Sequence, residues 1–301
     1  WYDIYSKYNN KNIIIHSKIY PSKILNILDF SNLKNSNLNN FTNLTIQKNL
    51  TKEKINNISR SLKIRSKKRK RKSLVQFFKK HKIPYKHSNL YKKSYLISKN
   101  IRSQTGQRNN IQKGFKVYKN DYQFFDFIFN LFNIPKEFIA IPFLESSFNS
   151  KAESKVGAKG TWQFMDYIGK KFFIQNSKID HRLNIYIASL GAMHLIRQNY
   201  KILKRYDLSV IAYNSGLKQI FRVRKKLKRK NISVKDLFSH SKTPHFGFAS
   251  SNFISEFLAL VYLLKYHPDY KIKKTMQSYK DKYFYVTLCK VIPELLFNNL
   301  S

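Results

Sequence analysis

The sequence predicts an all-α fold for its central part, residues 101–270. Apolar residues recur there at helical spacing, the connections between these segments are short, and no series of alternating apolar and polar residues intervenes. With 301 residues, the chain can bury a sizeable core without a disulfide or a metal staple. Its hydrophobic content of 42% is too high for wholesale disorder.

The region before residue 101 is expected to be less ordered. Residues 54–120 contain no carboxylate, and residues 67–72 form an unbroken basic run, so self-repulsion opposes compaction. We therefore expect residues 1–100 to form a basic, partly disordered or loosely helical region with one or two helices. Residues 50–62 are one candidate, because Thr51 can cap a helix and apolar residues follow at helical spacing.

Further helices are expected along the central part. One begins at Pro135, because proline suits a first helical turn and Glu137 lies well beside the N-terminal dipole. The others follow from apolar periodicity over residues 118–132, 161–173, 185–204, 207–213 and 253–266. Residues 271–301 form a C-terminal tail, in which residues 282–288 could be a strand.

The formal net charge of +42 favours a polyanionic partner such as nucleic acid, anionic lipid or an acidic polymer. A coding sequence biased toward A and T would also produce this excess, because Asn, Lys, Ile and Tyr are abundant while Gly, Pro and Ala are scarce. Charge alone therefore does not select the function.

Other features limit the classes of protein. The single cysteine, Cys289, excludes internal disulfides, four-cysteine zinc sites and Cys-X-X-Cys motifs. The longest apolar stretch, residues 253–264, is too short to span a bilayer. The chain begins at Trp1 without a basic-then-apolar leader, so we expect a targeting segment to be either removed or absent.

Glu145 is the first candidate catalytic residue. It follows the apolar run 138–144, and a carboxyl on an apolar face either pairs with a cation or stays protonated. A general acid near neutral pH needs its pKa raised by about two units from ~4.3, which corresponds to roughly 3 kcal/mol. The competing interpretation is a helix that ends near Glu145 and leaves the side chain solvated. Taken alone, this residue favours the solvated interpretation.

Two later segments carry further candidates. Gly157 and Gly160 permit a tight turn and a close approach of a ligand to the backbone. Residues 162–165 then bring an indole and the amide of Gln163 into a predicted helix, a combination that suits carbohydrate, although core packing explains it equally well. Residues 212–216 end an apolar helix with Asn and Gly, as a helix C-cap requires.

Together these segments resemble the catalytic domain of the lytic transglycosylases, which has a goose-lysozyme-like fold. The resemblance is to the membrane-bound lytic murein transglycosylase D type. In that family Glu-Ser-X-Phe is followed by Ser-X-X-Gly-Ala-X-Gly-X-Trp-Gln-Phe-Met and later by Ala-Tyr-Asn-X-Gly. These three motifs stand here at residues 145–148, 154–165 and 212–216. The resemblance covers residues 101–266 and departs from the family at Asp166, where proline is usual.

The resemblance implies roles for seven residues. Glu145 would be the catalytic acid and base. The substrate-binding residues would be Ser146, Ser154, Gln163, Met165, Tyr213 and Asn214. Tyr213 would form a hydrogen bond near Glu145, and together with Asn214 it would close the cleft over the acid. No metal or organic cofactor is implied.

The implied reaction needs only one acid. Glu145 would protonate the glycosidic oxygen between N-acetylmuramic acid and N-acetylglucosamine, and its carboxylate would then deprotonate the muramoyl C6 hydroxyl, which closes a 1,6-anhydro ring. Most glycosidases use two carboxylates, and Glu153 and Asp166 are weak candidates for a partner. We therefore expect a monomer that acts on peptidoglycan in a bacterial cell envelope, with residues 54–120 bound to an anionic wall or membrane surface.

Three alternatives stay open. The first is a hydrolytic muramidase on the same fold. The second is a nucleic-acid-binding protein that uses residues 60–100, where aromatic and basic residues interleave at 77–80 and 91–93 without forming a complete motif. We do not expect nucleic acid to be the partner. The third is a glycan-binding domain that has lost catalysis.

Overall fold

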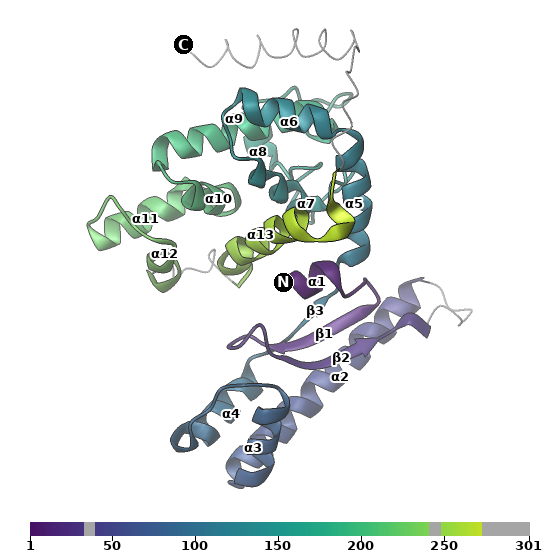
Figure 1. The fold of residues 1–301 in the computed structure, drawn as a ribbon, viewed down its shortest axis with the longest axis vertical. Helices are drawn as coiled ribbons and strands as arrows, with labels where there is room; N and C mark the ends of the chain where they lie inside the picture. Colours follow the sequence, from purple (N-terminus) through teal and green to yellow (C-terminus); the bar gives the residue numbers. More distant parts are fainter. Residues whose placement is uncertain (33–39, 241–247, 273–301) are drawn as a thin grey trace. The chain divides into compact units, whose positions relative to one another are not determined.

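The computed structural model describes residues 1–32, 40–240 and 248–272 (Figure 1). The chain divides into two compact units, residues 3–110 and the residues from 111 onward. The first unit contains helices and a small sheet, whereas the second is built from helices and the loops that join them. The candidate residues for chemistry all lie in the second unit.

The first unit combines a three-stranded antiparallel sheet with three longer helices. The strands are β1 (Asn12–Ser17), β2 (Ile24–Asp29) and β3 (Ile101–Thr105), in the order β2-β1-β3. The helices are α1 (Tyr2–Ser6), α2 (Asn40–Lys67), α3 (Arg71–Lys80), the 3-10 helix η2 (His87–Asn89) and α4 (Leu90–Lys99). The β-branched residues 13–15 favour the central strand, and Ile14 and Ile15 are buried in it.

This unit has a hydrophobic core of its own. Its buried members are Ile15, Leu25, Leu62, Leu74, Phe78, Ile83, Leu90 and Ile97. A helix does cover residues 50–62, but it is part of α2, which begins at Asn40, so the expected cap at Thr51 is wrong: its hydroxyl donates to the carbonyl of Gln47 inside the helix. The sheet was not anticipated, because β1 pairs with a strand more than 80 residues later and neither strand shows clear alternation in the sequence. The expected domain boundary at residue 101 stays a prediction, although β3 pairs with β1 and the two units divide after residue 110.

The second unit is helical, which confirms the all-α prediction for the central part. Its α-helices are α5 (Arg108–Asn120), α6 (Tyr122–Leu131), α7 (Ala140–Ser146), α8 (Asp166–Gly169), α9 (Ile185–Leu203), α10 (Tyr206–Ser215), α11 (Leu217–Leu227), α12 (Val234–His240) and α13 (Phe248–Tyr266). Three 3-10 helices complete it, namely η3 (Lys136–Ile139), η4 (His181–Leu183) and η5 (Pro268–Tyr270).

Local sequence signals explain where several of these helices begin and end. The Asn184 side chain accepts hydrogen bonds from the backbone N–H groups of Tyr186 and Ile187 and so caps the start of α9. Gly216 ends α10 with a φ of +76°, and its N–H donates to the carbonyl of Ala212, as the sequence predicted. Helix α7 packs against α13 and η3, and α10 packs against both α9 and α13 (Figure 1).

One predicted helix is wrong. Residues 161–173 form turns and the single short helix α8 instead of a continuous helix. Gly160 and Gln163 have left-handed backbone with φ values of +77° and +50°, which an α-helix does not allow. The expected strand at residues 282–288 lies outside the described residues. None of the helices in the described ranges has the length and the apolar character that crossing a membrane requires.

Candidate active site

Glu145 lies in the last turn of α7, whose earlier residues are buried in the core of the second unit. The helix ends abruptly because Ser147 and Phe148 both have left-handed backbone, with φ values of +51° and +62°. Such strain costs on the order of 1–3 kcal/mol per residue, and packing elsewhere must offset it. The buried Phe148 ring provides that packing, since its centroid lies 4.6 Å from that of Phe143.

A glycine on a neighbouring helix also fixes this turn. A Cβ on Gly114 of α5 would lie 2.3 Å from the carbonyl oxygen of Ser147. Only a residue without a side chain therefore allows α5 to approach the end of α7 so closely. The position of Glu145 is thus determined by the buried helix before it and by the strained, tightly packed turn after it.

The surroundings of Glu145 favour its neutral form. Its pKa is raised from 4.5 to about 8, mainly by burial and in smaller part by the negative charge of Glu256 on α13. Within the described ranges no Lys or Arg forms a salt bridge with Glu145, although the chain contains 58 such residues. The side chain is therefore a protonated acid at neutral pH, which favours the buried interpretation of this residue over the solvated one.

Tyr213 of α10 shares the surroundings of Glu145. Burial raises the pKa of its phenol well above 10, and the charge that Glu145 can carry acts in the same direction. Its hydroxyl donates a hydrogen bond to the carbonyl of Trp162 at 2.7 Å. The proton of Tyr213 therefore points to the backbone of the glycine-containing loop and not to the carboxyl, which differs from the hydrogen bond that the family resemblance implies.

The loop of residues 152–164 carries the amide of Gln163, which lines the same cleft as Glu145 and Tyr213. Gln163 donates from Nε2 to the carbonyls of Ala152, at 3.2 Å, and of Gly160, at 2.9 Å. Because these bonds use both N–H groups of the amide, its oxygen is the atom that Gln163 can offer to a ligand. Ser154 closes the other end of the loop by accepting a hydrogen bond from the N–H of Ala158 at 2.9 Å.

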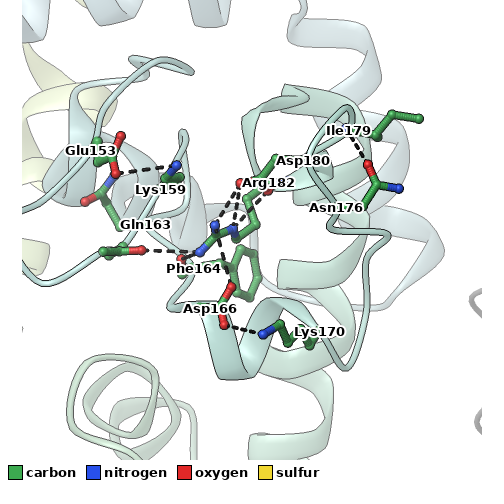
Figure 2. Close-up of polar contacts among 12 residues, drawn as sticks. Glu153, Lys159, Gln163, Phe164, Asp166, Lys170, Asn176, Ile179, Asp180 and Arg182 are labelled. Carbon is green, nitrogen blue, oxygen red and sulfur yellow. Dashed lines mark hydrogen bonds and ion pairs between the residues drawn. The ribbon is translucent and has the colours of Figure 1, made fainter.

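Arg182 holds this loop through hydrogen bonds to its backbone and lies among Lys159, Phe164 and Asp180 in Figure 2. The side chain is 5% exposed and binds Asp180 through two parallel hydrogen bonds, Nε to Oδ1 at 2.9 Å and Nη2 to Oδ2 at 2.7 Å. Its Nη1 donates to the carbonyls of Gly157 and Phe164, each at 3.3 Å. The Arg182 guanidinium lowers the pKa of Asp180, so this acid stays ionised.

The loop is fitted tightly to the residues beneath it. A Cβ on Gly160 would lie 1.8 Å from the carbonyl oxygen of Arg182, so no other residue fits there. Trp162 is fully buried, and its Nε1 donates to Ser189 Oγ at 2.7 Å. The indole therefore belongs to the core and is not a sugar-binding surface, which answers the question that the sequence left open.

A cleft of about 860 Å³ brings most of the candidate residues together. Six of the seven line it, namely Glu145, Ser154, Gln163, Met165, Tyr213 and Asn214. Ser146 does not, because its Oγ donates to the carbonyl of Thr161 at 2.8 Å and so joins α7 to the loop. Aromatic surface in the cleft comes from Phe164, Tyr167 and Phe172.

The sequence analysis missed one wall of the cleft. This wall contains Leu195, Gln198, Asn199, Lys201 and Ile202 of α9, and Lys171 lines the cleft after α8. The spacing 195, 198, 199 and 202 is one face of a helix and was visible in the sequence. This spacing predicts a helix and nothing more, because nothing in the sequence shows that this face borders a cleft.

The cleft thus contains one acid whose raised pKa favours its neutral form, and it lies in a unit built of helices. Residues 132–235 match the family model described as the transglycosylase SLT domain, so the chain carries an SLT domain over these residues. This match confirms the sequence-based resemblance to lytic transglycosylases.

Two curated proteins are similar to part of this chain. They are the membrane-bound lytic murein transglycosylase D of Escherichia coli strain K12 and that of E. coli O6:H1 strain CFT073. Each is 27% identical over 107 residues, which cover 34% of this chain and 23% of the relative. The chain thus matches less than a quarter of the length of these relatives.

Proposed function

We propose that this protein is a peptidoglycan lytic transglycosylase that cleaves the β-1,4 bond between N-acetylmuramic acid and N-acetylglucosamine. The observation that carries the proposal is the state of Glu145, an unpaired carboxyl that lines the cleft with a pKa of about 8. A general acid works best when its pKa lies near the working pH, and burial provides that here. The SLT match supports the choice of substrate.

In the proposed reaction Glu145 acts twice. It first donates its proton to the glycosidic oxygen, so that N-acetylglucosamine leaves as an alcohol while the 2-acetamido group of the muramoyl residue assists its departure. The Glu145 carboxylate then takes the proton of the muramoyl C6 hydroxyl, and this oxygen attacks C1. The product is a 1,6-anhydromuramoyl end, Glu145 is protonated again, and no water is consumed.

The proposal is consistent with the acids around the cleft. Among the described residues that line it, Glu145 is the only carboxylate. A hydrolase of the usual kind needs a second carboxylate, about 5–5.5 Å away for retention and farther for inversion. Glu153 forms a 3.4 Å ion pair with Lys159 outside the cleft lining, and Asp166 pairs with Lys170 at 2.7 Å. Neither of these carboxylates lines the cleft.

Mass spectrometry of digested sacculi tests this proposal. We expect wild type to release fragments one water lighter than those of a hydrolytic muramidase, and Glu145→Gln to release none. Glu153→Gln is the matched control, because it removes a carboxyl from the same unit outside the cleft and should leave the products unchanged. Reducing-end muramic acid from wild type would instead make the protein a muramidase. Binding of glycan without any cleavage would make it a lectin-like domain.

The basic residues of the first unit suggest where the enzyme works. We propose that residues 54–120 bind an anionic wall or membrane surface in the bacterial cell envelope. Residues 67–72 are all exposed and basic, and no carboxylate occurs anywhere in residues 54–120 to neutralise them. Attraction of this kind is long-ranged and is weakened by salt.

Sedimentation of the whole chain with sacculi or with anionic phospholipid vesicles tests this second proposal. Replacing Lys67, Lys68, Lys70 and Lys72 by Gln should lower the bound fraction at low salt. The same number of changes at Lys225, Lys226, Lys228 and Lys230 serves as the control for total charge. Equal losses in both variants would show that only net charge matters, and would overturn a specific role for residues 54–120.

A further inference from the structure

The charged side chains that line the cleft are positive at neutral pH. Two lysines, Lys171 and Lys201, line it, and neither forms a salt bridge within the described residues. The neighbouring Lys170 differs, since it pairs with Asp166 at 2.7 Å (Figure 2). The one acid that lines the cleft, Glu145, is held in its neutral form by burial. The cleft therefore presents two positive charges and no compensating negative charge at neutral pH.

A buried amide on the same wall also lacks a partner. Asn199 is 3% exposed, lines the cleft, and has no hydrogen-bond partner for its Nδ2 group. A buried donor without an acceptor costs about 1–3 kcal/mol, so such atoms are rare in proteins and indicate a bound water, an ion or a functional role. The missing partner must be an acceptor, because Nδ2 can only donate. Lys171 and Lys201 are exposed donors that line the same cleft and form no salt bridge within the described residues.

His194 shows that these groups share one location. Its ring lies 5.6 Å from that of Phe172, the residue that follows Lys171. Its Nε2 lies 2.9 Å from Gln198 Nε2, one turn along α9 and next to Asn199. Burial lowers the pKa of His194, and the charge of Lys201 lowers it further. His194 is therefore neutral and leaves the positive charge of this wall to the two lysines.

The composition of the chain offers a simpler explanation, because lysine is abundant everywhere in it. Solvated lysines alone would not explain the unpaired Asn199 amide beside them. Leu195 and Ile202 flank Asn199 on the same face of α9 and border the cleft with apolar surface. An apolar wall concentrates the field of nearby charges and strengthens their effect on a bound anion.

We propose that Lys171, Lys201 and Asn199 form a carboxylate-recognition site at one wall of the cleft, which selects glycan strands that carry acidic groups. The inference rests on the proposed function, since it assigns a substrate preference to the same cleft. In peptidoglycan two sources supply such a group. Strands that have lost their peptides carry the free lactyl carboxylate of muramic acid, and intact strands carry the carboxylates of the stem peptide.

Binding measurements on the Glu145→Gln protein test the site separately from cleavage. The probes are a peptide-free muramoyl tetrasaccharide, the same tetrasaccharide with stem peptides, and the neutral N-acetylglucosamine tetrasaccharide. We expect the Lys171→Ala/Lys201→Ala variant to lose about tenfold in affinity for an acidic probe. Its affinity for the neutral probe should stay within about twofold. The acidic probe that shows the larger loss identifies the source of the carboxylate.

A matched variant controls for charge. The control variant is Lys178→Ala/Lys226→Ala. Like Lys171, Lys178 lies outside the helices, and like Lys201 in α9, Lys226 lies in the last turn of a helix, α11. Neither Lys178 nor Lys226 lines the cleft. The control variant should bind every probe like the parent protein. Equal weakening in both variants, or equal weakening toward acidic and neutral probes, would overturn the proposal.

Asn199 supplies a second and independent test. Asn199→Asp keeps the shape of the side chain but replaces the unpaired donor by an acceptor. We expect it to weaken binding of the acidic probes more than binding of the neutral one, and a cooperative melting transition checks that the variant is folded at the pH of the assay. Unchanged affinity for the acidic probes would remove Asn199 from the site. Loss of cleavage by wild type with the selective binding intact would instead overturn the proposed function alone.

Discussion

Glu145 and Asp180 are carboxyl groups of the same unit that meet opposite surroundings. Asp180 is joined to Arg182 by a bidentate ion pair that lowers its pKa and fixes its charge. Glu145 has no cationic partner among the described residues, and burial raises its pKa to about 8. The strongly basic chain thus uses one acid as a structural anion and keeps another neutral. The difference shows that local pairing and not net charge decides what each acid can do.

The largest stability effect should come from breaking the structural pair. Arg182→Met leaves the Asp180 charge without its partner and removes two bonds to loop carbonyls, and such losses cost about 3–5 kcal/mol. Urea denaturation measures this as a lower midpoint. Arg205→Met is the control. The side chains of Arg205 and Asp207 are 41% and 37% exposed, so their ion pair should contribute less than about 1 kcal/mol. Similar losses in the two variants would contradict a special role for Arg182.

A second prediction concerns the contact between the loop and the Arg182 backbone. Gly157 and Gly160 both have positive φ, but only Gly160 lacks room for a Cβ. Gly160→Ala should therefore lower the free energy of unfolding by about 3 kcal/mol, whereas Gly157→Ala should lower it by about 1 kcal/mol from backbone strain alone. Thermal and urea unfolding compare them. Equal effects would mean that backbone strain and not the close approach dominates.

The third prediction is that the two acids respond to pH in opposite ways. Because the pKa of Glu145 is raised on folding, its contribution to stability is complete below pH 4.5 and is lost as the pH rises toward 8. Wild type should therefore lose stability over this window relative to Glu145→Gln, by up to about 1.4 kcal/mol for each pKa unit of the shift. Because the pKa of Asp180 is lowered, its contribution should be lost only as the pH falls below 3.8. Urea titrations at several pH values measure both, and parallel curves for wild type and Glu145→Gln would contradict a raised pKa.

The sequence predicted the parts of this site that depend on local patterns. It located α9, α10 and α13 and the C-cap at Gly216, and six of its seven candidate residues line the cleft, because each belongs to a short motif or a periodic run. It failed for residues 161–173, where aromatic spacing suggested a helix. The backbone there is set by tertiary contacts, since Gly160 lies against Arg182 and the Trp162 carbonyl accepts from Tyr213.

Two further failures have the same cause. The sheet of the first unit depends on pairing between distant strands, which no local pattern reveals. The α9 wall of the cleft has an ordinary helical spacing, and its role becomes visible only because residues of the loop and of α10 line the same cleft. Local patterns alone therefore did not select Glu145, whose proposed role came from the family resemblance, and the α9 residues that line the cleft had to be found in the structure.

The smallest predicted effect concerns the tuning of Glu145. Helix α13 packs against α7, and the charge of Glu256 on α13 adds to the effect of burial on the pKa of Glu145. The rate of cleavage should fall as the pH rises through about 8, because the acid then loses its proton. Glu256→Gln removes the repelling charge and should move this fall to lower pH, without changing the rate at pH 6, where Glu145 is protonated in both proteins.

A plot of kcat/KM against pH measures this shift, and Glu153→Gln provides the control because its carboxyl is paired with Lys159 away from the cleft. Burial is the larger cause of the raised pKa, so the Glu256→Gln profile should still fall well above pH 4.5. If the Glu256→Gln profile instead fell near pH 4.5, as for an ordinary glutamate, the charge of Glu256 and not burial would be the main cause of the raised pKa of Glu145. An unchanged profile would instead leave burial as the sole cause, and Glu145 would then owe its proton to the apolar surroundings of α7 alone.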